Sequence, residues 1–328
     1  KMLSALNMLM RCLSDSTTTK KNAMEGGREL LTPQNGKRLL DSTDAFLLDC
    51  DGVIWKGDKL IDGVSDALQF LRSKGKKLIF VTNNSSKSRR QYAAKFLSFG
   101  VIVSEDEIFS SSFAASMFLK TTHFSANSKV YVLGREGIVD ELRSAGFTAI
   151  GGPEDDKKTI MLQSDYFLEH DKSVGAVVVG LDPWINYYKL HYATLCIREN
   201  PNCLFIATNR DAVGHLTESQ EFPGAGTMVS AVCGSTGRDP IVVGKPSGFM
   251  MDFLLQKWNI SPSRMCMVGD RLDTDILFGK AAGCRTLLVL SGVTSLSELQ
   301  HPTNSILPDL YTNQLSDLLH ILQPLNLN

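Results

Sequence analysis

The chain has 328 residues, of which 43% are hydrophobic and 21% are charged. This is the composition of an ordinary globular protein long enough for about two domains, and it excludes a collagen, a coiled coil or a disordered chain. The 34 basic and 35 acidic side chains leave a net charge of −1, so no overall field favours nucleic acid or an anionic membrane. No apolar run reaches the roughly 18–20 residues needed to cross a bilayer, and a membrane-spanning segment is therefore not expected.

The N-terminal segment differs in composition from the rest. Its first 23 residues carry four basic side chains, a single acid and several serines and threonines. This composition is typical of an organelle transit segment, and an unstructured end is the equally weighted alternative. Met24 would also serve as a start site. We therefore predict that residues 1–40 form a flexible or transit-like segment outside the fold.

From Asp44 onwards, short apolar segments alternate with stretches of helical periodicity. Strands are predicted at residues 45–49, 77–82, 129–133, 174–180, 204–207, 240–244, 265–269 and 285–290. Helices are predicted at residues 63–74, 88–97, 137–145, 187–198, 249–257 and 274–282. The charged stretch 151–173 is expected to be a loop or an edge element. Alternation of strand and helix predicts an α/β fold with a parallel sheet.

The first candidate site follows the predicted strand that ends near Leu48. Asp49 and Asp51 are two residues apart, which in a regular strand would place both carboxylates on one face, where they repel each other. A bound cation or phosphoryl group would explain the pair, because one carboxylate can attack phosphorus and the other can protonate the leaving oxygen. Gly52 allows a sharp turn beside a ligand. The alternative is a strand that ends in an ordinary polar turn.

Two further predicted strands end in side chains suited to phosphate. Thr82 and Asn83 follow residues 77–81, and a hydroxyl and an amide can donate hydrogen bonds to phosphoryl oxygens. The alternative for this pair is a helix cap. Lys245 follows residues 240–244, where a lysine is a point charge suited to phosphate. The alternative there is a solvated lysine in front of a helix.

The fourth candidate segment is a cluster of acids. Asp270, Asp273 and Asp275 follow the predicted strand 265–269 within six residues. Carboxylate oxygens are preferred ligands of Mg²⁺, although acids in the first turn of a helix also stabilise the helix dipole. The second interpretation fits Asp273 best. Because ligands of open α/β sheets bind at the carboxyl ends of the strands, all four segments can converge on one site.

The order of these segments resembles the four motifs of the haloacid dehalogenase superfamily. It runs from an acid pair through a threonine and a lysine to an acid cluster, each behind an apolar strand, and the resemblance covers residues 44–320. It implies a Rossmann-like core with a doubly wound parallel sheet. The presence of Asp51 two residues after Asp49 resembles the phosphatase branch of the superfamily, which has an acid at this position. The resemblance further implies that Asp49 is the nucleophile and that Asp51 is the general acid and base.

The same resemblance implies roles for the remaining motif residues. Thr82 and Lys245, with Asn83 beside them, would hold the phosphoryl oxygens. The Mg²⁺ ligands would be oxygens of residues that follow strands, namely Asp270, the carboxylate of Asp49 and the main-chain carbonyl of Asp51. Asp275 would support this set of ligands.

The spacing of the motifs predicts an inserted domain. Thr82 and Lys245 are 163 residues apart, far more than a crossover between two strands requires. We predict a catalytic core at residues 41–104 and 231–328 and an α/β cap at residues 105–230. The cap resembles the large cap of nitrophenylphosphatases and phosphoglycolate phosphatases, which excludes water and selects the leaving group. Its segment 207–215 resembles their substrate-specificity loop, and a surface loop is the alternative. The residues expected to contact substrate there are Asn209, Arg210 and His215.

Several stretches, among them residues 49–57 and 269–279, are similar to plant phosphoglycolate phosphatases. This similarity implies Mg²⁺-dependent hydrolysis of 2-phosphoglycolate in photorespiration, by a homodimer formed through the caps. It also implies that the protein is located in the chloroplast or in the cytosol. The basic segment 1–23 slightly favours the chloroplast. A phosphatase of pyridoxal 5′-phosphate or of aryl phosphates is the alternative enzyme. A non-catalytic phosphatase-like binding protein is the alternative outside enzymes, and the intact motif set argues against it.

Overall fold

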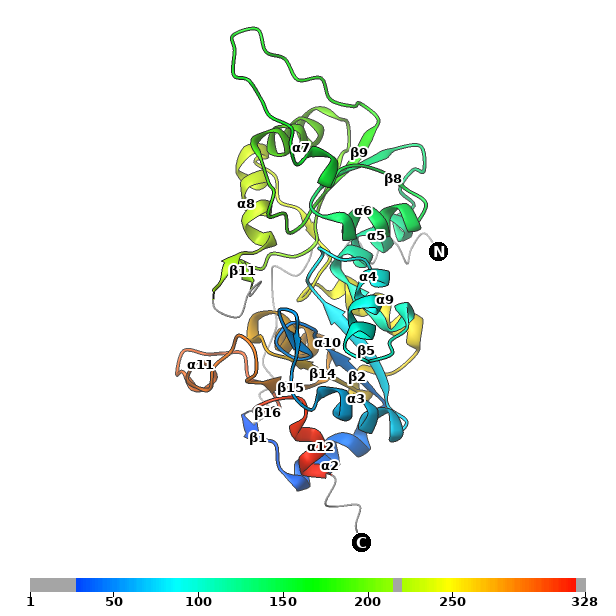
Figure 1. Ribbon diagram of the computed structural model, residues 1–328, viewed down its shortest axis with the longest axis vertical. Helices are drawn as coiled ribbons and strands as arrows, with labels where there is room; N and C mark the ends of the chain where they lie inside the picture. The colour runs from blue at the N-terminus through cyan, green and yellow to red at the C-terminus, as the bar shows by residue number, and fades with distance from the viewer. Residues whose placement is uncertain (1–27, 215–219, 323–328) are drawn as a thin grey trace.

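The computed structural model of the protein describes residues 28–214 and 220–322. Two parallel sheets are stacked along the long axis of the molecule, each packed between helices (Figure 1). We call the unit built on the larger sheet the core and the unit built on the smaller sheet the cap. Among the described residues, no helix combines the length and the apolarity needed to cross a membrane.

The core contains a seven-stranded sheet in which all neighbouring strands are parallel. Its strands, in spatial order, are β1 (Glu29–Leu30), β16 (Leu310–Thr312), β15 (Arg285–Val289), β14 (Met265–Gly269), β2 (Ala45–Leu48), β5 (Lys77–Thr82) and β6 (Ile108–Ser110). Its helices are α2 (Pro33–Ser42), α3 (Val64–Ser73), α4 (Arg89–Ser98), α9 (Gly248–Trp258), α10 (Leu277–Ala282), α11 (Leu296–Gln300) and α12 (Asp317–Leu322). A small antiparallel hairpin is formed by β3 (Trp55–Lys56) and β4 (Lys59–Leu60).

The central strand β2 is buried on both faces of the core sheet. Phe46 and Leu48 belong to the hydrophobic cluster that contains α3 and α4 side chains, whereas Ala45 and Leu47 belong to the cluster on the α9 side. A strand covered on both faces is apolar at every position, which is why its sequence shows no alternation. The predicted doubly wound α/β core is confirmed.

The cap contains a five-stranded sheet, also parallel throughout. Its strands, in spatial order, are β13 (Ile241–Val242), β10 (Leu204–Ala207), β9 (Val174–Val179), β7 (Lys129–Leu133) and β8 (Thr148–Gly151). Its helices are α6 (Glu136–Ser144), α7 (Tyr187–Glu199) and α8 (Ala225–Thr236), and β11 (Val213–Gly214) pairs with β12 (Phe222–Pro223). The stretch 151–173 is predicted to be a loop or an edge element. Gly151 ends the edge strand β8, Gly152–Asp155 form a 3₁₀ helix, and the rest is the long green loop at the top of Figure 1.

Sheet membership differs from the predicted domain limits in two places. Strand β6 lies inside the range 105–230 predicted for the cap, yet it pairs with β5 of the core. Strand β13 lies in the range predicted for the core, yet it pairs with β10 of the cap. The physical reason is that an apolar run of two or three residues carries no local information about which sheet it joins. Lys245 lies three residues after β13, on the connection from the cap sheet to the core helix α9.

Residues 28–40 also correct the prediction, because they belong to the fold. Strand β1 pairs with β16, and the side chains of Leu31 and Leu39 are buried. Thr32 caps α2 by accepting a hydrogen bond from the Asn35 N–H. These apolar residues are too few to show a periodic stripe, but they complete one edge of the core. The predicted transit-like residues 1–27 lie outside the described residues.

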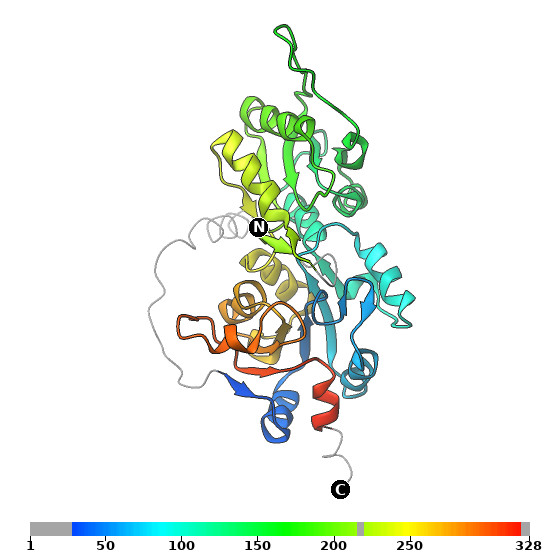
Figure 2. The same ribbon diagram turned by 60° about the vertical axis from the view of Figure 1, so that its left-hand side comes forward.

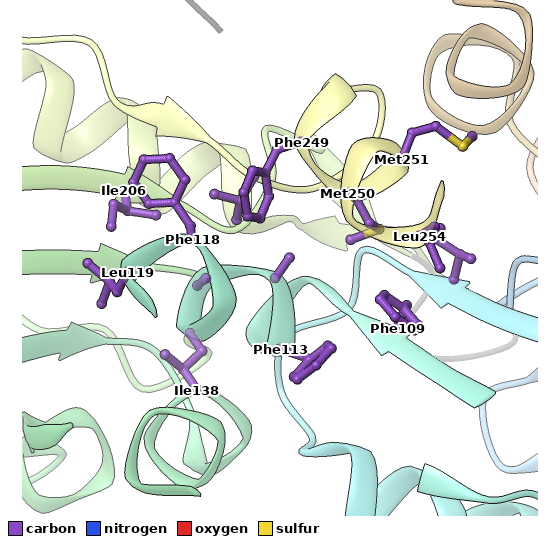
Figure 3. Close-up of a cluster of buried hydrophobic side chains, with 14 of the residues drawn as sticks. Phe109, Phe113, Phe118, Leu119, Ile138, Ile206, Phe249, Met250, Met251 and Leu254 are labelled. Atoms are coloured by element: carbon purple, nitrogen blue, oxygen red, sulfur yellow. The ribbon is translucent and has the colours of Figure 1, made fainter. Parts of the chain in front are cut away.

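The core and the cap share one continuous hydrophobic cluster (Figure 3). Phe109 comes from the core sheet, Phe118 from helix α5 (Ser111–Thr121), Ile206 from the cap sheet and Phe249 from α9. The rings of Phe118 and Phe249 meet edge to face with centroids 5.3 Å apart. Figure 2 shows the same stacking of the two units from a second direction. Shared packing of this kind holds the cap at the carboxyl ends of the core strands.

Candidate active site

A cavity of about 300 Å³ lies where the core strands end beneath the cap. Its walls come from three core strand ends, from the β3–β4 hairpin and from the cap segment around β11. The lining residues that belong to the sequence motifs are Asp49, Asp51, Thr82, Asn83, Lys245, Asp270 and Asp275. The fold thus brings all four motifs to one place.

Lys245 is held in the cavity by three hydrogen-bond acceptors. Its Nζ donates to Asp49 Oδ1 at 2.6 Å, to Asp275 Oδ1 at 2.7 Å and to the Val81 carbonyl at 2.7 Å. All three N–H bonds of the ammonium group are therefore used. Burial alone would lower the pKa of Lys245, but Asp275 and Asp49 outweigh burial and raise it. Lys245 therefore supplies a fixed positive charge beside Asp49.

Asp270 is fixed by the backbone of two loops. Its Oδ2 accepts a hydrogen bond from the Val293 N–H at 2.7 Å. A Cβ atom on Gly52 or on Gly292 would collide with the Asp270 carboxylate. Gly52 also has a φ of +84°, a conformation that other residues rarely adopt. Glycine at position 52 is therefore required both for the turn and for the close approach of Asp270.

Asp275 ties the Asp270 loop to Lys245. It lies on a π-helical turn, Leu272–Ile276, that leads into α10, and such turns are frequent at functional sites. Its Oδ2 accepts hydrogen bonds from the N–H groups of Asp270 and Arg271, both at 3.1 Å, while its Oδ1 accepts from Lys245. With both oxygens engaged, Asp275 orients its neighbours.

Three buried carboxylates lie within reach of one ion. The oxygens of Asp49, Asp270 and Asp275 lie within 4.8 Å of one another. Burial raises the pKa of Asp49 well above its usual range, and burial together with Asp275 raises the pKa of Asp270 to about 7. Lys245 neutralises only one of the three negative charges, so the cluster keeps excess negative charge. Oxygen donors with uncompensated charge fit a hard divalent cation such as Mg²⁺.

Asp51 lies at the edge of the cavity and is anchored by Trp55. The Trp55 Nε1–H donates to Asp51 Oδ1 at 2.9 Å. Trp55 is fully buried, and its ring packs edge-on against Phe96 at a centroid distance of 4.8 Å. The Lys95 Nζ lies 4.3 Å from the centroid of the same ring. A donor held this firmly fixes the direction of the Asp51 carboxylate, and the sequence reasoning did not single it out.

Thr82 and Asn83 lie side by side but have different surroundings. The Thr82 Oγ1 accepts a hydrogen bond from the Asn84 N–H at 3.1 Å and lines the cavity. The Asn83 Nδ2 donates to the Lys245 carbonyl at 3.0 Å, and its Oδ1 accepts from the Lys245 N–H at 2.8 Å. The same Nδ2 also donates to Asp211. The Asn83 amide therefore positions Lys245, which corrects the predicted use of this side chain as a phosphate donor.

The predicted specificity loop of the cap reaches the cavity only in part. Asn209 is buried, lines the cavity and donates from Nδ2 to the Asn83 carbonyl at 2.7 Å. Arg210 is exposed and its guanidinium pairs with Asp239 at 2.7 Å, so the structure does not bring it into the site. His215 lies outside the described residues.

Sequence reasoning missed three charged residues of the cavity, namely Lys56, Asp211 and Arg271. Burial raises the pKa of Asp211, which accepts a hydrogen bond from the Asn83 Nδ2 at 3.1 Å. Arg271 donates to Asp273 at 3.0 Å and to the Val213 carbonyl of the cap at 3.4 Å. Asp211 and Arg271 each lie next to a predicted site residue in the sequence. This adjacency was the signal that could have found them.

Comparisons with known proteins agree with this geometry. The family described as haloacid dehalogenase-like hydrolase matches residues 46–148, and a HAD-hydrolase-like family matches residues 242–318. Phosphoglycolate phosphatase 2 of Arabidopsis thaliana is 66% identical over 296 residues, which cover 90% of this chain and 98% of that protein. The chain belongs to the haloacid dehalogenase-like hydrolases. The family predicted from the four motifs is confirmed, and this haloacid dehalogenase-like protein is a phosphatase.

Two further matches support the family and the fold. Phosphoglycolate phosphatase 1A, chloroplastic, of Arabidopsis thaliana is 61% identical over 286 residues, which cover 87% of this chain and 79% of that protein. The p-nitrophenyl phosphatase from Archaeoglobus fulgidus superposes with a TM-score of 0.72 at 33% identity, covering 85% of this chain and 99% of that structure. This likeness confirms the haloacid dehalogenase-like core with an inserted cap.

Proposed function

We propose that the chain hydrolyses 2-phosphoglycolate to glycolate and phosphate, in an Mg²⁺-dependent reaction through an aspartyl-phosphate on Asp49, as a step of photorespiration. The observation that carries the chemistry is the 2.6 Å contact between Asp49 and Lys245 beside carboxylates that lie within ion-binding reach of one another. The names of the Arabidopsis relatives support the substrate.

The first half of the reaction forms the aspartyl-phosphate. The Asp49 carboxylate attacks phosphorus while the bond to the leaving oxygen breaks, and Asp51 donates a proton to that oxygen. The Lys245 ammonium supplies a fixed positive charge beside the phosphoryl oxygens, and the Thr82 hydroxyl, which lines the cavity, donates a hydrogen bond to them. Phosphoryl transfer depends mainly on positioning and charge neutralisation, which suits a lysine whose position is set by fixed neighbours.

The second half releases phosphate and regenerates the enzyme. Asp51, now a carboxylate, accepts a proton from a water molecule whose oxygen attacks phosphorus, and the bond from phosphorus to Asp49 breaks. The Trp55 N–H keeps Asp51 oriented during both halves. Cap residues line the cavity together with the core residues, and a cap in this position limits the access of water to the site.

We assign the Mg²⁺ ligands to Asp270, to the Asp49 carboxylate and to the main-chain carbonyl of Asp51. Asp275 keeps these ligands in place through its hydrogen bonds to the Asp270 N–H and to Lys245. When bound, the ion supplies positive charge against the phosphoryl oxygens. It also offsets the excess negative charge of the buried carboxylates.

The stabilising effect of Mg²⁺ is expected to grow as the pH rises. The pKa of Asp270 is raised to about 7, above its unfolded value, so between roughly pH 4 and pH 7 the metal-free folded protein binds more protons than the unfolded chain. The stability of the metal-free protein therefore falls as the pH rises through this window. Since protons compete with the cation for the same carboxylates, Mg²⁺ should raise the Tm more above pH 7 than near pH 5.

Thermal unfolding with Mg²⁺ and with a chelator, across this pH range, measures the effect. The Asp270→Asn variant is the control, because it lacks the titrating carboxylate and should lose most of the Mg²⁺ effect at every pH. An equal rise in Tm at both ends of the range in the wild-type protein would contradict the assignment.

The lining of the cavity favours a small acidic substrate over a pyridine ring. Among the described lining residues, Trp55 is the single aromatic side chain, and it is fully buried. The cavity is at the lower end of the usual range for ligand sites. Lys56 and Arg271 supply positive charge on its walls. The small volume and the two cations support 2-phosphoglycolate as the substrate.

The test compares kcat/KM for 2-phosphoglycolate, pyridoxal 5′-phosphate and 4-nitrophenyl phosphate on one preparation with Mg²⁺. A preference for 2-phosphoglycolate of about 100-fold or more, roughly 2.7 kcal/mol of transition-state binding, supports the proposal. The reverse preference would overturn the substrate and leave the roles of Asp49 and Asp51 in place.

We further propose that the protein forms a homodimer through its cap. Large apolar side chains are exposed there, on the 157–173 loop and around the start of α7, and these are Met161, Leu162, Phe167, Trp184 and Tyr187. Exposed apolar side chains gathered on one unit are typical of an interface. Analytical ultracentrifugation of the wild-type protein and of a Phe167→Ser, Trp184→Ser variant measures this, and a monomeric wild-type protein would contradict it.

The compartment stays a prediction between the chloroplast and the cytosol. The basic, hydroxyl-rich residues 1–23 and the chloroplastic relative support the chloroplast. Localisation of a fluorescent fusion of the full chain tests the choice.

A further inference from the structure

Three cationic side chains line the cavity, and two of them already have partners. The Lys245 ammonium is bound by Asp49, Asp275 and a carbonyl. The Arg271 guanidinium is bound by Asp273 and by a cap carbonyl. The side chain of the third, Lys56, has no hydrogen bond or ion pair with any residue in the described ranges 28–214 and 220–322. Lys56 is therefore the cation of the cavity wall that is free to meet an anion.

The hairpin that carries Lys56 is anchored on both sides of it. The preceding residue, Trp55, is fully buried in the core. The carbonyl of the following residue, Gly57, accepts a hydrogen bond from the Lys95 Nζ at 2.7 Å. Lys56 itself is exposed and lines the cavity. The backbone of Lys56 is thus fixed, and the flexible part of the residue is its side chain.

Lys56 and Asp51, the proposed acid for the leaving oxygen, line the same cavity. Asp51 protonates the leaving oxygen, and its carboxylate is bound by the indole of Trp55, the residue next to Lys56. In the proposed reaction the phosphoryl group binds to Asp49, beside Lys245 and the buried carboxylates, and Lys56 is not hydrogen-bonded to any of these side chains. A substituent on the leaving oxygen therefore lies near the hairpin, where an ammonium group attracts negative charge.

We propose that Lys56 is a specificity-determining residue that binds an anionic substituent, a carboxylate, on the leaving group of the substrate. This inference rests on the proposed phosphoglycolate phosphatase function and assigns the substrate carboxylate to the core hairpin rather than to the cap loop. Asp211, the acid that the cap contributes to the cavity, is hydrogen-bonded to Asn83. An uncharged leaving group gains nothing from Lys56.

The experiment measures kcat/KM for 2-phosphoglycolate and for 4-nitrophenyl phosphate, whose leaving group carries no carboxylate. Lys56→Gln should lower kcat/KM for 2-phosphoglycolate by about 10- to 100-fold and change kcat/KM for 4-nitrophenyl phosphate by less than about threefold. Lys56→Arg keeps the charge and should retain most of the preference. Lys59→Gln is the matched control, because Lys59 pairs with Lys56 across the hairpin but is not among the described residues that line the cavity.

The outcomes separate the two proposals. If the wild-type protein prefers 2-phosphoglycolate and Lys56→Gln keeps that preference, the assignment of Lys56 is wrong and the proposed function stands. An equal loss in Lys56→Gln and Lys59→Gln would also overturn it, because the effect would then be a long-range field. If the wild-type protein has no preference for 2-phosphoglycolate, the proposed function fails and the role of Lys56 fails with it.

Discussion

Asp49→Asn is expected to abolish phosphate release, lowering kcat by at least about 10³-fold. An amide is not a nucleophile toward phosphorus, so the covalent intermediate cannot form. The fold should survive, because burial raises the pKa of Asp49 and the folded state therefore disfavours its charge. Lys245 keeps Asp275 and the Val81 carbonyl as acceptors. Steady-state release of phosphate and the Tm of the variant measure the two effects.

Cys50→Ser is the matched control for this substitution. Cys50 is the next residue in the chain and is fully buried, and burial raises the pKa of its thiol well above its usual value. We therefore expect Cys50→Ser to keep kcat within a few-fold of the wild-type value. Asp49→Ala guards against slow conversion of the new asparagine to aspartate. Substantial turnover by Asp49→Ala, with no phosphate trapped on the wild-type chain by acid quenching, would rule out Asp49 as the nucleophile.

Lys245→Met is expected to damage both activity and stability. Removing the ammonium leaves Asp49, Asp270 and Asp275 buried together without their cation. Loss of one partner from a buried ion pair typically costs about 3–5 kcal/mol, so the free energy of unfolding should fall by about that amount near neutral pH. Because the carboxylates can take up protons instead, the loss should shrink as the pH is lowered. Chemical denaturation with a chelator, at neutral and at mildly acidic pH, measures it.

A variant of a second buried lysine distinguishes the loss of activity in Lys245→Met from its loss of stability. In the cap, the Lys189 Nζ is fully buried and pairs with Asp156 at 2.6 Å and with Asp182 at 2.7 Å. Lys189→Met should destabilise the protein to a similar extent while leaving kcat within a few-fold of the wild-type value. Lys245→Met should instead lower kcat by about 10³-fold or more, because the phosphoryl oxygens lose their fixed positive charge. Equal losses of kcat in both variants would argue that Lys245 acts through stability alone.

The strand ends that carry the chemistry could be predicted from the sequence. Strand β2 ends just before Asp49, β5 ends at Thr82 and β14 ends just before Asp270, as the apolar segments indicate. Strands buried on both faces are apolar throughout, which makes them a strong local signal. Their convergence also followed, because the carboxyl ends of parallel strands share one edge of the sheet.

Some site residues could not be assigned from local patterns. The side chain of Asn83 is suited by type to phosphate binding and, more commonly, to helix capping, and the structure uses it to hold the backbone of Lys245. Trp55 reads as one apolar residue among several, yet its N–H orients Asp51. Arg210 looks as suitable for substrate binding as Asn209, but it pairs with Asp239 at the surface.

The sequence by itself determined the α/β class, the family and the types of residue that perform the chemistry. Each of these can be recognised from short segments that have a local pattern. Only the tertiary structure decided that the strand before Lys245 joins the cap sheet, that residues 28–40 complete the core and that Lys56 lines the cavity. These features depend on contacts between segments far apart in the chain. Hydrophobic periodicity records which residues are buried, but not which distant residue they meet.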